Sequence, residues 1–172
     1  MISESQANIT DADCEGIVNT VNCVGVMGGG VAKAIREKYP WCFSPYRDAC
    51  ESNLLQPGGL FIVQLRVTPN IKYPQIINMA TKNHWRGKSR LEWVDRGLEN
   101  LSTHLSSAKL STIAIPRPGC GLGGLNWADV KPLIEKHLGK LECEIIIHHN
   151  NSAESAGHPL TVQTTLHLKE EE

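Results

Sequence analysis

Short hydrophobic runs and longer amphipathic stretches alternate along this chain. The runs are rich in isoleucine, valine and leucine, residue types that suit the pleated and buried surface of a sheet. They predict strands at residues 2–9, 16–21, 60–65, 75–79, 112–115 and 144–148. Residues 160–168 also alternate between apolar and polar positions, which is typical of one more strand.

Between these runs, apolar residues at steps of three and four predict amphipathic helices. The clearest helix follows Ser89-x-x-Glu92, which fits a capping box at a helix start. Its apolar face consists of Leu91, Val94, Leu98, Leu101 and Leu105. The other expected helices run from Val31 to Tyr39, where Pro40 stops the helix, from Pro45 to about Ser52, and from Trp127 to Leu138, where Pro132 disturbs the first turn.

The alternation of strands and helices predicts an α/β fold with a sheet that is covered on both faces. A chain of 172 residues forms one domain with a sizeable core. We assign residues 1–149 to this domain and residues 150–172 to a C-terminal tail that adds at most one strand. In such folds ligands bind beyond the carboxyl ends of the strands.

Charge and hydropathy limit the possible partners of the chain. The net charge of −1 excludes a general polyanion-binding surface, so that any contact with nucleic acid must be local. No stretch is long and apolar enough to span a membrane, and the N-terminus lacks a signal-peptide pattern. We therefore expect a cytoplasmic protein, a monomer, with no membrane contact.

The six cysteines are dispersed, and none forms a C-x-x-C pair. This spacing favours reduced thiols and predicts neither a zinc site nor any other metal site. Cys120 is the one cysteine that we consider as a nucleophile, because it lies in a glycine-rich loop. The alternative is a small residue that fits a crowded turn.

Two glycine-rich stretches follow predicted strands. Residues 18–34 pass from a buried strand through Asn19 and Asn22 into Gly28-Gly-Gly30 and then into a helix. Residues 118–125, with the sequence PGCGLGGL, likewise lead from a strand to a helix. Glycine lets the backbone approach a ligand closely, and the N–H groups of a helix start favour an anion such as phosphate. Two such loops could close on one diphosphate, although a glycine run is also compatible with a simple tight connection, and the first matches neither the dinucleotide motif nor the P-loop.

The combination of Gly16-Ile-Val-Asn-Thr-Val-Asn22, Gly28-Gly-Gly30 and Pro118-Gly-Cys-Gly-Leu-Gly-Gly-Leu125 resembles the macrodomain family of ADP-ribose binders. The resemblance covers roughly residues 1–149. It implies a three-layer α/β/α sandwich around a mixed, mostly parallel sheet, with ADP-ribose in a cleft at the crest and no cofactor. The ADP-ribose contacts that it implies are Asn8, Ile9, Asn19, Asn22, Val26, Met27, Gly28, Gly29, Gly30, Val31, Thr81, Pro118, Gly119, Cys120, Gly121, Leu122, Gly123, Gly124 and Leu125. Asn8 and Ile9 would lie near the adenine, where many members carry Asp in place of Asn8.

Within the family, Val24-Gly-Val-Met-Gly28 and Ala80-Thr-Lys-Asn-His-Trp-Arg86 are most similar to the branch of terminal ADP-ribose glycohydrolase and the DarG-type antitoxins. This similarity implies a catalytic role for Lys82. Terminal ADP-ribose glycohydrolase pairs its lysine with an Asp, whereas this chain has Gly123 at that position, as the DarG-like enzymes do. The departure favours ADP-ribosylated thymidine in single-stranded DNA as the substrate, and a DarT-like toxin as the cognate partner.

The chemistry allows two roles for Lys82. As a neutral amine it could attack the anomeric carbon of the distal ribose, and as a cation it could hydrogen-bond to the sugar or the base. His84, Arg86 and Lys88 would lower its pKa if they crowd it, whereas the diphosphate of the ligand would raise it. The alternative is that Lys82 has no catalytic role and is a solvated lysine in a loop. His84 is the second catalytic candidate, and the alternative is a histidine that packs against or caps the loop.

Residues 84–90 interleave one tryptophan with three cations. A base could stack on Trp85 while the cations meet backbone phosphates, or Trp85 could pack in the core beside an exposed helix start. Three functions are compatible with the whole pattern. They are a hydrolase that removes ADP-ribose from a macromolecule, a module that only binds ADP-ribose, and a phosphatase or deacetylase acting on ADP-ribose derivatives.

Overall fold

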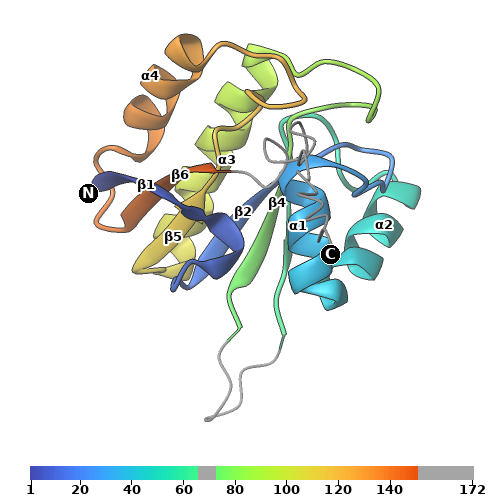
Figure 1. Ribbon diagram of the computed structural model, residues 1–172, viewed down its shortest axis with the longest axis horizontal. Coiled ribbons are helices and arrows are strands. Elements are labelled where there is room, and N and C mark those ends of the chain that lie inside the picture. The colour runs from blue at the N-terminus through green and yellow to red at the C-terminus, as the bar shows by residue number, and fades with distance from the viewer. Residues whose placement is uncertain (66–72, 151–172) are drawn as a thin grey trace, which may run out of the picture.

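One six-stranded sheet forms the centre of the protein in a computed structural model that describes residues 1–65 and 73–150 (Figure 1). The strands are β1 (Ile2–Asn8), β2 (Gly16–Val21), β3 (Leu60–Val63), β4 (Gln75–Ala80), β5 (Thr112–Ile115) and β6 (Glu144–Asn150). Their order across the sheet is β1-β6-β5-β2-β4-β3. All neighbours pair in parallel except β3 and β4. The predicted mixed, mostly parallel sheet is therefore confirmed.

Helices cover both faces of this sheet. They are α1 (Gly30–Lys38), α2 (Phe43–Glu51), α3 (Leu91–Ala108) and α4 (Trp127–Leu138), together with the short 3-10 turns η1 (Ile9–Asp11) and η2 (Pro40–Cys42). Ile76 and Ala80 of β4 pack into the core beneath α1 and α2, whereas Ile77 and Met79 pack into the core beneath α3 and α4. The alternation along one strand thus serves two cores, and Figure 1 shows the resulting three layers.

The predicted boundaries of β2, β5 and α4 are confirmed residue for residue, and Pro132 is accommodated inside α4 without ending it. Helix α2 begins two residues before the predicted Pro45, and β3 ends at Val63. The predicted strand at residues 160–168 and the rest of the tail lie outside the described residues.

The predicted capping box at Ser89 is wrong. The residue that precedes α3 is Arg90, and no side chain caps the helix start. Ser89 is instead buried, and its backbone N–H donates to the carbonyl of Gly123 at 3.0 Å. The sequence pattern around Ser89 indicates helix capping, but a contact with a distant loop determines its conformation.

The parallel strands β2, β4 and β5 end at the same edge of the sheet. Three loops leave this edge, residues 22–29 after β2, 81–90 after β4 and 116–126 after β5. Both predicted glycine loops and Lys82 are therefore carried to one side of the molecule by the topology alone.

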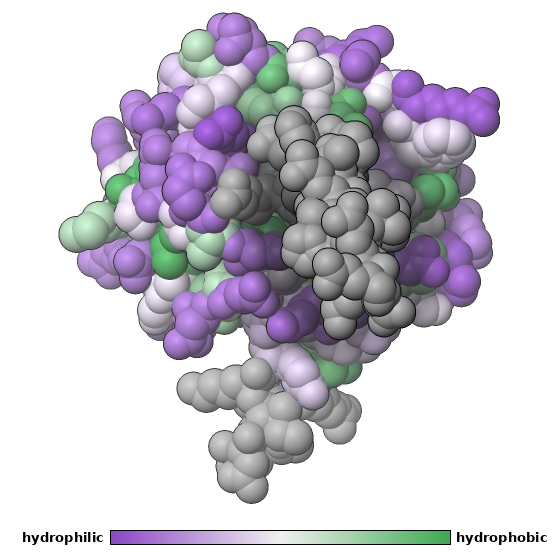
Figure 2. Space-filling model, in the orientation of Figure 1, coloured by the Kyte–Doolittle hydropathy of each residue, from purple (hydrophilic) through white to green (hydrophobic). Residues whose placement is uncertain are grey.

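On the face that Figure 2 shows, most of the described surface is hydrophilic and hydrophobic side chains are scattered. Within residues 1–65 and 73–150, no helix combines the length and the apolar character that a membrane span needs. All six cysteines are free thiols, as predicted.

Candidate functional site

A cleft of about 380 Å³ opens between the three loops at the carboxyl edge of the sheet. Its predicted lining residues are Asn22, Val26, Gly28, Gly29, Gly30, Val31, Thr81, Lys82, Gly119, Gly121, Leu122 and Gly123, and they are joined by Thr20, Val21, Ala32, Trp85 and Arg117. Both glycine loops therefore border the same cavity as Lys82.

The loop after β2 is organised by the side chain of Asn22. Its Nδ2 donates to the carbonyl of Val26 at 2.7 Å, and its Oδ1 accepts from the N–H groups of Val24 and Val26 at 3.0 and 3.3 Å. The buried hydroxyl of Tyr46 lies 2.8 Å from the backbone oxygen of Asn22 and 3.0 Å from its Oδ1. Asn22 is thus a structural centre of this loop as well as a lining residue of the cleft.

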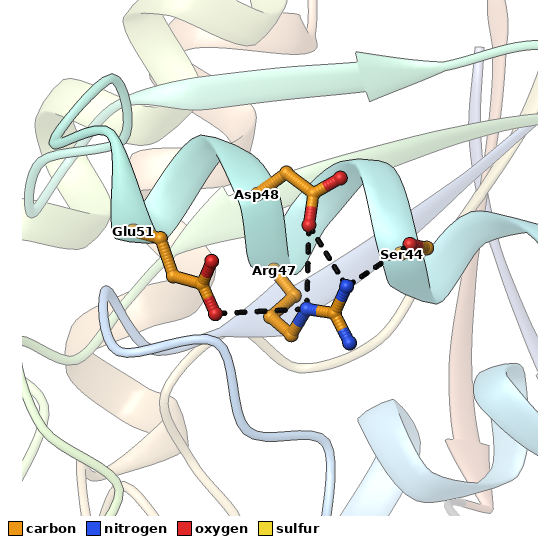
Figure 3. A network of polar contacts seen from close by, with 4 residues as sticks. All are labelled: Ser44, Arg47, Asp48 and Glu51. Atoms are coloured by element: carbon orange, nitrogen blue, oxygen red, sulfur yellow. Dashed lines mark hydrogen bonds and ion pairs between the residues drawn. The ribbon is translucent and has the colours of Figure 1, made fainter.

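Residue Arg47 of helix α2 packs against the same loop, and Figure 3 shows the polar contacts of its guanidinium. Gly25 has a φ of +81°, and a Cβ at this position would lie 3.1 Å from Cγ of Arg47. The guanidinium of Arg47 donates to Ser44 Oγ at 3.3 Å and forms ion pairs with Asp48 at 3.0 Å and Glu51 at 3.7 Å. Each of these exposed pairs contributes little to stability. The Arg47 stem lies close to Gly25, and the positive φ of Gly25 favours glycine there.

The first glycine loop ends at the start of α1. Gly29 is the residue that precedes the helix, and no side chain caps it. The first N–H groups of α1 therefore have no partner within the helix, and the positive end of the helix dipole lies at the cleft. Gly28, Gly29 and Gly30 all line the cleft, so this end of the cavity is suited to an anionic ligand.

The second glycine loop is a tight turn. Gly124 N–H donates to the Gly121 carbonyl at 3.0 Å, and Leu125 N–H donates to the Gly119 carbonyl at 2.9 Å. Gly119 and Gly124 have positive φ values of +74° and +78°. A Cβ at Gly123 would overlap both Ser89 Oγ and the Gly119 carbonyl oxygen. The packing behind the loop therefore requires glycine at residue 123.

Cys120 lies in this loop but does not line the cleft. Burial raises the pKa of its thiol to about 11, and the charge of Arg117 opposes this effect. A thiol with this pKa is almost entirely protonated at neutral pH, and the thiolate is the nucleophilic form. The structure therefore supports the alternative reading, in which Cys120 is a small residue that fits a crowded turn.

Lys82 is the second residue after β4, and its backbone N–H donates to the Val21 carbonyl at 3.3 Å. Its Nζ donates to the carbonyl of Leu122 in the second glycine loop at 2.9 Å. Burial lowers the pKa of this amine, and the charge of Lys88 lowers it further. Lys82 is therefore a positioned, partly buried amine in the cleft, which argues against the reading of a solvated loop lysine.

The aromatic residues after Lys82 lie at the surface. Trp85 is 46% exposed and lines the cleft, so it is not a core residue. The His84 ring stacks on it with centroids 5.5 Å apart, and the Arg86 guanidinium lies 4.5 Å from the indole centroid. His84 itself does not line the cleft, and its Nδ1 accepts the N–H of Arg86 at 3.2 Å. This contact supports the reading in which His84 caps its own loop.

Several residues that the resemblance implies as ADP-ribose contacts do not line the cleft. They are Asn8, Ile9, Asn19, Met27, Pro118, Cys120, Gly124 and Leu125. Asn19 is fully buried and its Nδ2 donates to Asn78 Oδ1 at 2.9 Å, while Asn8 Oδ1 accepts the N–H of Thr10 at 3.2 Å. Ile9, Asn19, Met27 and Pro118 are buried, which a contiguous motif cannot reveal.

The sequence prediction also missed lining residues, namely Thr20, Val21, Ala32 and Arg117. Thr20 and Val21 end β2, and Ala32 is in the first turn of α1, so their proximity to the motif was the available signal. Arg117 directly precedes the second glycine-rich stretch. Its guanidinium contacts His149 and lies 5.2 Å from the centroid of Trp127. This residue ties the second loop to β6 and α4.

Comparison with known proteins is consistent with this geometry. A sequence model described as Macro domain matches residues 18–134. A Mycobacterium tuberculosis protein named DNA ADP-ribosyl glycohydrolase is 40% identical over 131 residues, which is 76% of this chain and 37% of that protein. The chain thus spans little more than a third of that relative's length.

Two solved structures are similar over most of the chain. The macrodomain of Thermus aquaticus DarG matches with a TM-score of 0.81 and 37% identity, covering 87% of this chain and 99% of that one. Thermosipho africanus DarTG in complex with ADP-ribose matches with a TM-score of 0.79 and 27% identity, covering 86% of this chain and 41% of that one.

Proposed function

Because this chain belongs to the macrodomain family and has its fold, we propose that it is a glycosidic-bond hydrolase that removes ADP-ribose from DNA. The specific substrate that we propose is ADP-ribosylated thymidine in single-stranded DNA. The observation that carries this proposal is the position of the Lys82 amine, in the same cleft as both glycine loops and hydrogen-bonded to one of them. The names of the relatives support the same reaction.

The diphosphate of ADP-ribose would lie between the two loops. The unpaired N–H groups at the start of α1 would bind one side of it, and the backbone of Gly121 to Gly123 would border the other. Ile9 is fully buried, and Asn8 Oδ1 accepts the N–H of Thr10. An adenine contact at these two residues would therefore come from Asn8 Nδ2 or from the main chain.

The reaction then follows from a neutral amine at Lys82. The amine attacks the anomeric carbon of the distal ribose, and the bond from this carbon to the base nitrogen breaks. The base nitrogen keeps the electron pair of that bond and takes up the proton that the amine loses. Water next adds to the anomeric carbon, and the amine leaves with a proton from that water. The lowered pKa of Lys82 shifts the amine toward the neutral form that this covalent version needs.

The DNA strand would cross the mouth of the cleft beside Trp85. His84, Trp85 and Arg86 form a stacked group of two aromatic rings and one guanidinium at this surface. A base next to the modified thymidine can stack on such a group without regard to its identity. A DarT-like toxin would be the enzyme that makes the substrate, and we propose it as the cognate partner.

Incubation with a thymidine-linked ADP-ribosylated oligonucleotide, followed by mass spectrometry, tests the proposal. We expect the wild-type chain to release one ADP-ribose and restore unmodified thymidine, and Lys82→Ala to bind ADP-ribose but not release it. Binding without release by the wild type would assign a module that only recognises ADP-ribose. Release from acid-linked ADP-ribosylated protein alone, in a parallel reaction, would assign a protein substrate instead.

A further inference from the structure

A second lysine reaches the loop that holds Lys82. A Cβ at Gly124 would lie 3.4 Å from both Cδ and Nζ of Lys88, so the Lys88 side chain extends along the second glycine loop at this residue. Lys82 Nζ binds the same loop at the carbonyl of Leu122. The two ammonium groups therefore border one turn, two residues apart along its backbone.

The fold holds both lysines in these places. The N–H groups of Thr81 and Lys82 donate to the Val21 carbonyl, which ties the start of the 81–90 segment to β2. Ser89 is buried and donates its N–H to the Gly123 carbonyl, which ties the end of the segment to the second glycine loop. The backbone next to Lys88 is thus fixed against the loop, although the Lys88 side chain is exposed.

No carboxylate compensates these two charges within residues 1–65 and 73–150, where neither lysine belongs to an ion pair. The turn cannot easily supply one, because any side chain at residue 123 would overlap Ser89 Oγ and the Gly119 carbonyl. A like charge nearby and burial each disfavour the charged form of an amine. Here that is Lys82, whose pKa is lowered by burial first and by Lys88 second.

The other cations near the site contact partners of their own. Arg86 lies over the Trp85 ring, and Arg90 pairs with Glu92 at 3.6 Å and lies 4.9 Å from the Trp93 centroid. Arg117 contacts His149 and Trp127, and His84 accepts a hydrogen bond from the Arg86 backbone. Lys88 is thus the charged group that lies on the loop bound by Lys82 and that also lowers the pKa of Lys82.

We propose that Lys88 is a positioning residue for the reaction: its side chain lies on the same turn that binds Lys82 Nζ, and its charge across the second glycine loop favours the uncharged, nucleophilic form of the Lys82 amine. The inference rests on the proposed function for its catalytic meaning. The electrostatic coupling between the two lysines is a property of the unliganded protein and can be measured without any substrate.

The first test is an NMR pH titration of the chain with ¹³C-labelled lysine side chains, in which the Lys82 signal is identified by its loss in Lys82→Arg. Wild type is compared with Lys88→Met, with the conservative Lys88→Arg, and with Lys140→Met as a control at an exposed lysine outside the cleft. We expect Lys88→Met alone to move the Lys82 titration to higher pH. An unchanged Lys82 titration in Lys88→Met would overturn the inference whether or not the chain is a hydrolase.

The second test measures turnover against pH on ADP-ribosylated thymidine nucleoside, which has no DNA backbone. Turnover by a neutral amine rises with pH through the pKa of that amine, so Lys88→Met should shift this rise to higher pH and keep the plateau. Lys88→Arg should restore the wild-type profile. A defect of Lys88→Met that appears only with the oligonucleotide, and not with the nucleoside, would assign Lys88 to a DNA phosphate and contradict the proposal.

Discussion

Replacing Gly123 with alanine tests how the second glycine loop is packed. The added methyl group would overlap Ser89 Oγ and the Gly119 carbonyl oxygen, one of which is backbone and cannot rotate away. Forcing a methyl group into a packed site typically costs about 1–3 kcal/mol. At roughly 2–4 °C per kcal/mol for a domain of this size, we expect the Tm of Gly123→Ala to fall by roughly 2–12 °C.

Gly121→Ala is the matched control in the same turn. A Cβ at Gly121 would have no neighbour within 4 Å, and its φ does not lie in the left-handed region. Its Tm should therefore stay within about 2 °C of wild type, because such a substitution also reduces the entropy of the unfolded chain.

The overlap at Gly123 can also be relieved by an outward shift of the loop, so thermal denaturation is combined with calorimetry of ADP-ribose binding. A shifted loop would no longer border the diphosphate, and the affinity of Gly123→Ala for ADP-ribose would fall. Unchanged Tm together with unchanged affinity would show that Ser89 and Gly119 do not enclose residue 123 as described.

Two further substitutions separate DNA contact from catalysis. Lys82→Ala serves as a background that prevents turnover. In this background, Trp85→Ala should weaken binding of the ADP-ribosylated oligonucleotide by roughly 5- to 150-fold, which corresponds to the about 1–3 kcal/mol of one stacked base. The affinity for free ADP-ribose should fall less, and equal losses for the two ligands would refute the stacking role. Lys82→Ala alone should keep its calorimetric affinity for ADP-ribose within about tenfold of wild type, because it removes one partly exposed hydrogen bond. A larger loss of affinity would mean that Lys82 serves binding instead of chemistry.

The parts of the fold that are local in origin could be predicted from the sequence. Strands β2 and β5 are short and rich in β-branched residues, and α4 has a clear start at Asn126, whose side chain accepts the N–H of Ala128 at 3.1 Å. The two glycine loops could be placed together because parallel strands end at one edge of a sheet. These predictions needed only residue pattern and chain topology.

What could not be predicted depends on contacts between distant segments. Ser89 fits a helix-capping pattern, yet its backbone binds Gly123, which lies far along the chain. Asn19 lies within the recognised motif but faces the core, where it binds Asn78 on the neighbouring strand β4. The exposure of Trp85 and the pairing of Lys82 with Leu122 likewise arise only once β4 and β5 bring their loops together.

The central claim is that two glycine loops enclose the diphosphate and present the distal ribose to the Lys82 amine. A crystal structure of the chain with bound ADP-ribose measures this directly. The account predicts the diphosphate between residues 28–30 and 121–123, with Lys82 Nζ within about 3–3.5 Å of the anomeric carbon, the separation of a reactive geometry. A nucleotide bound elsewhere, or a Lys82 side chain directed into solvent away from the sugar, would contradict it.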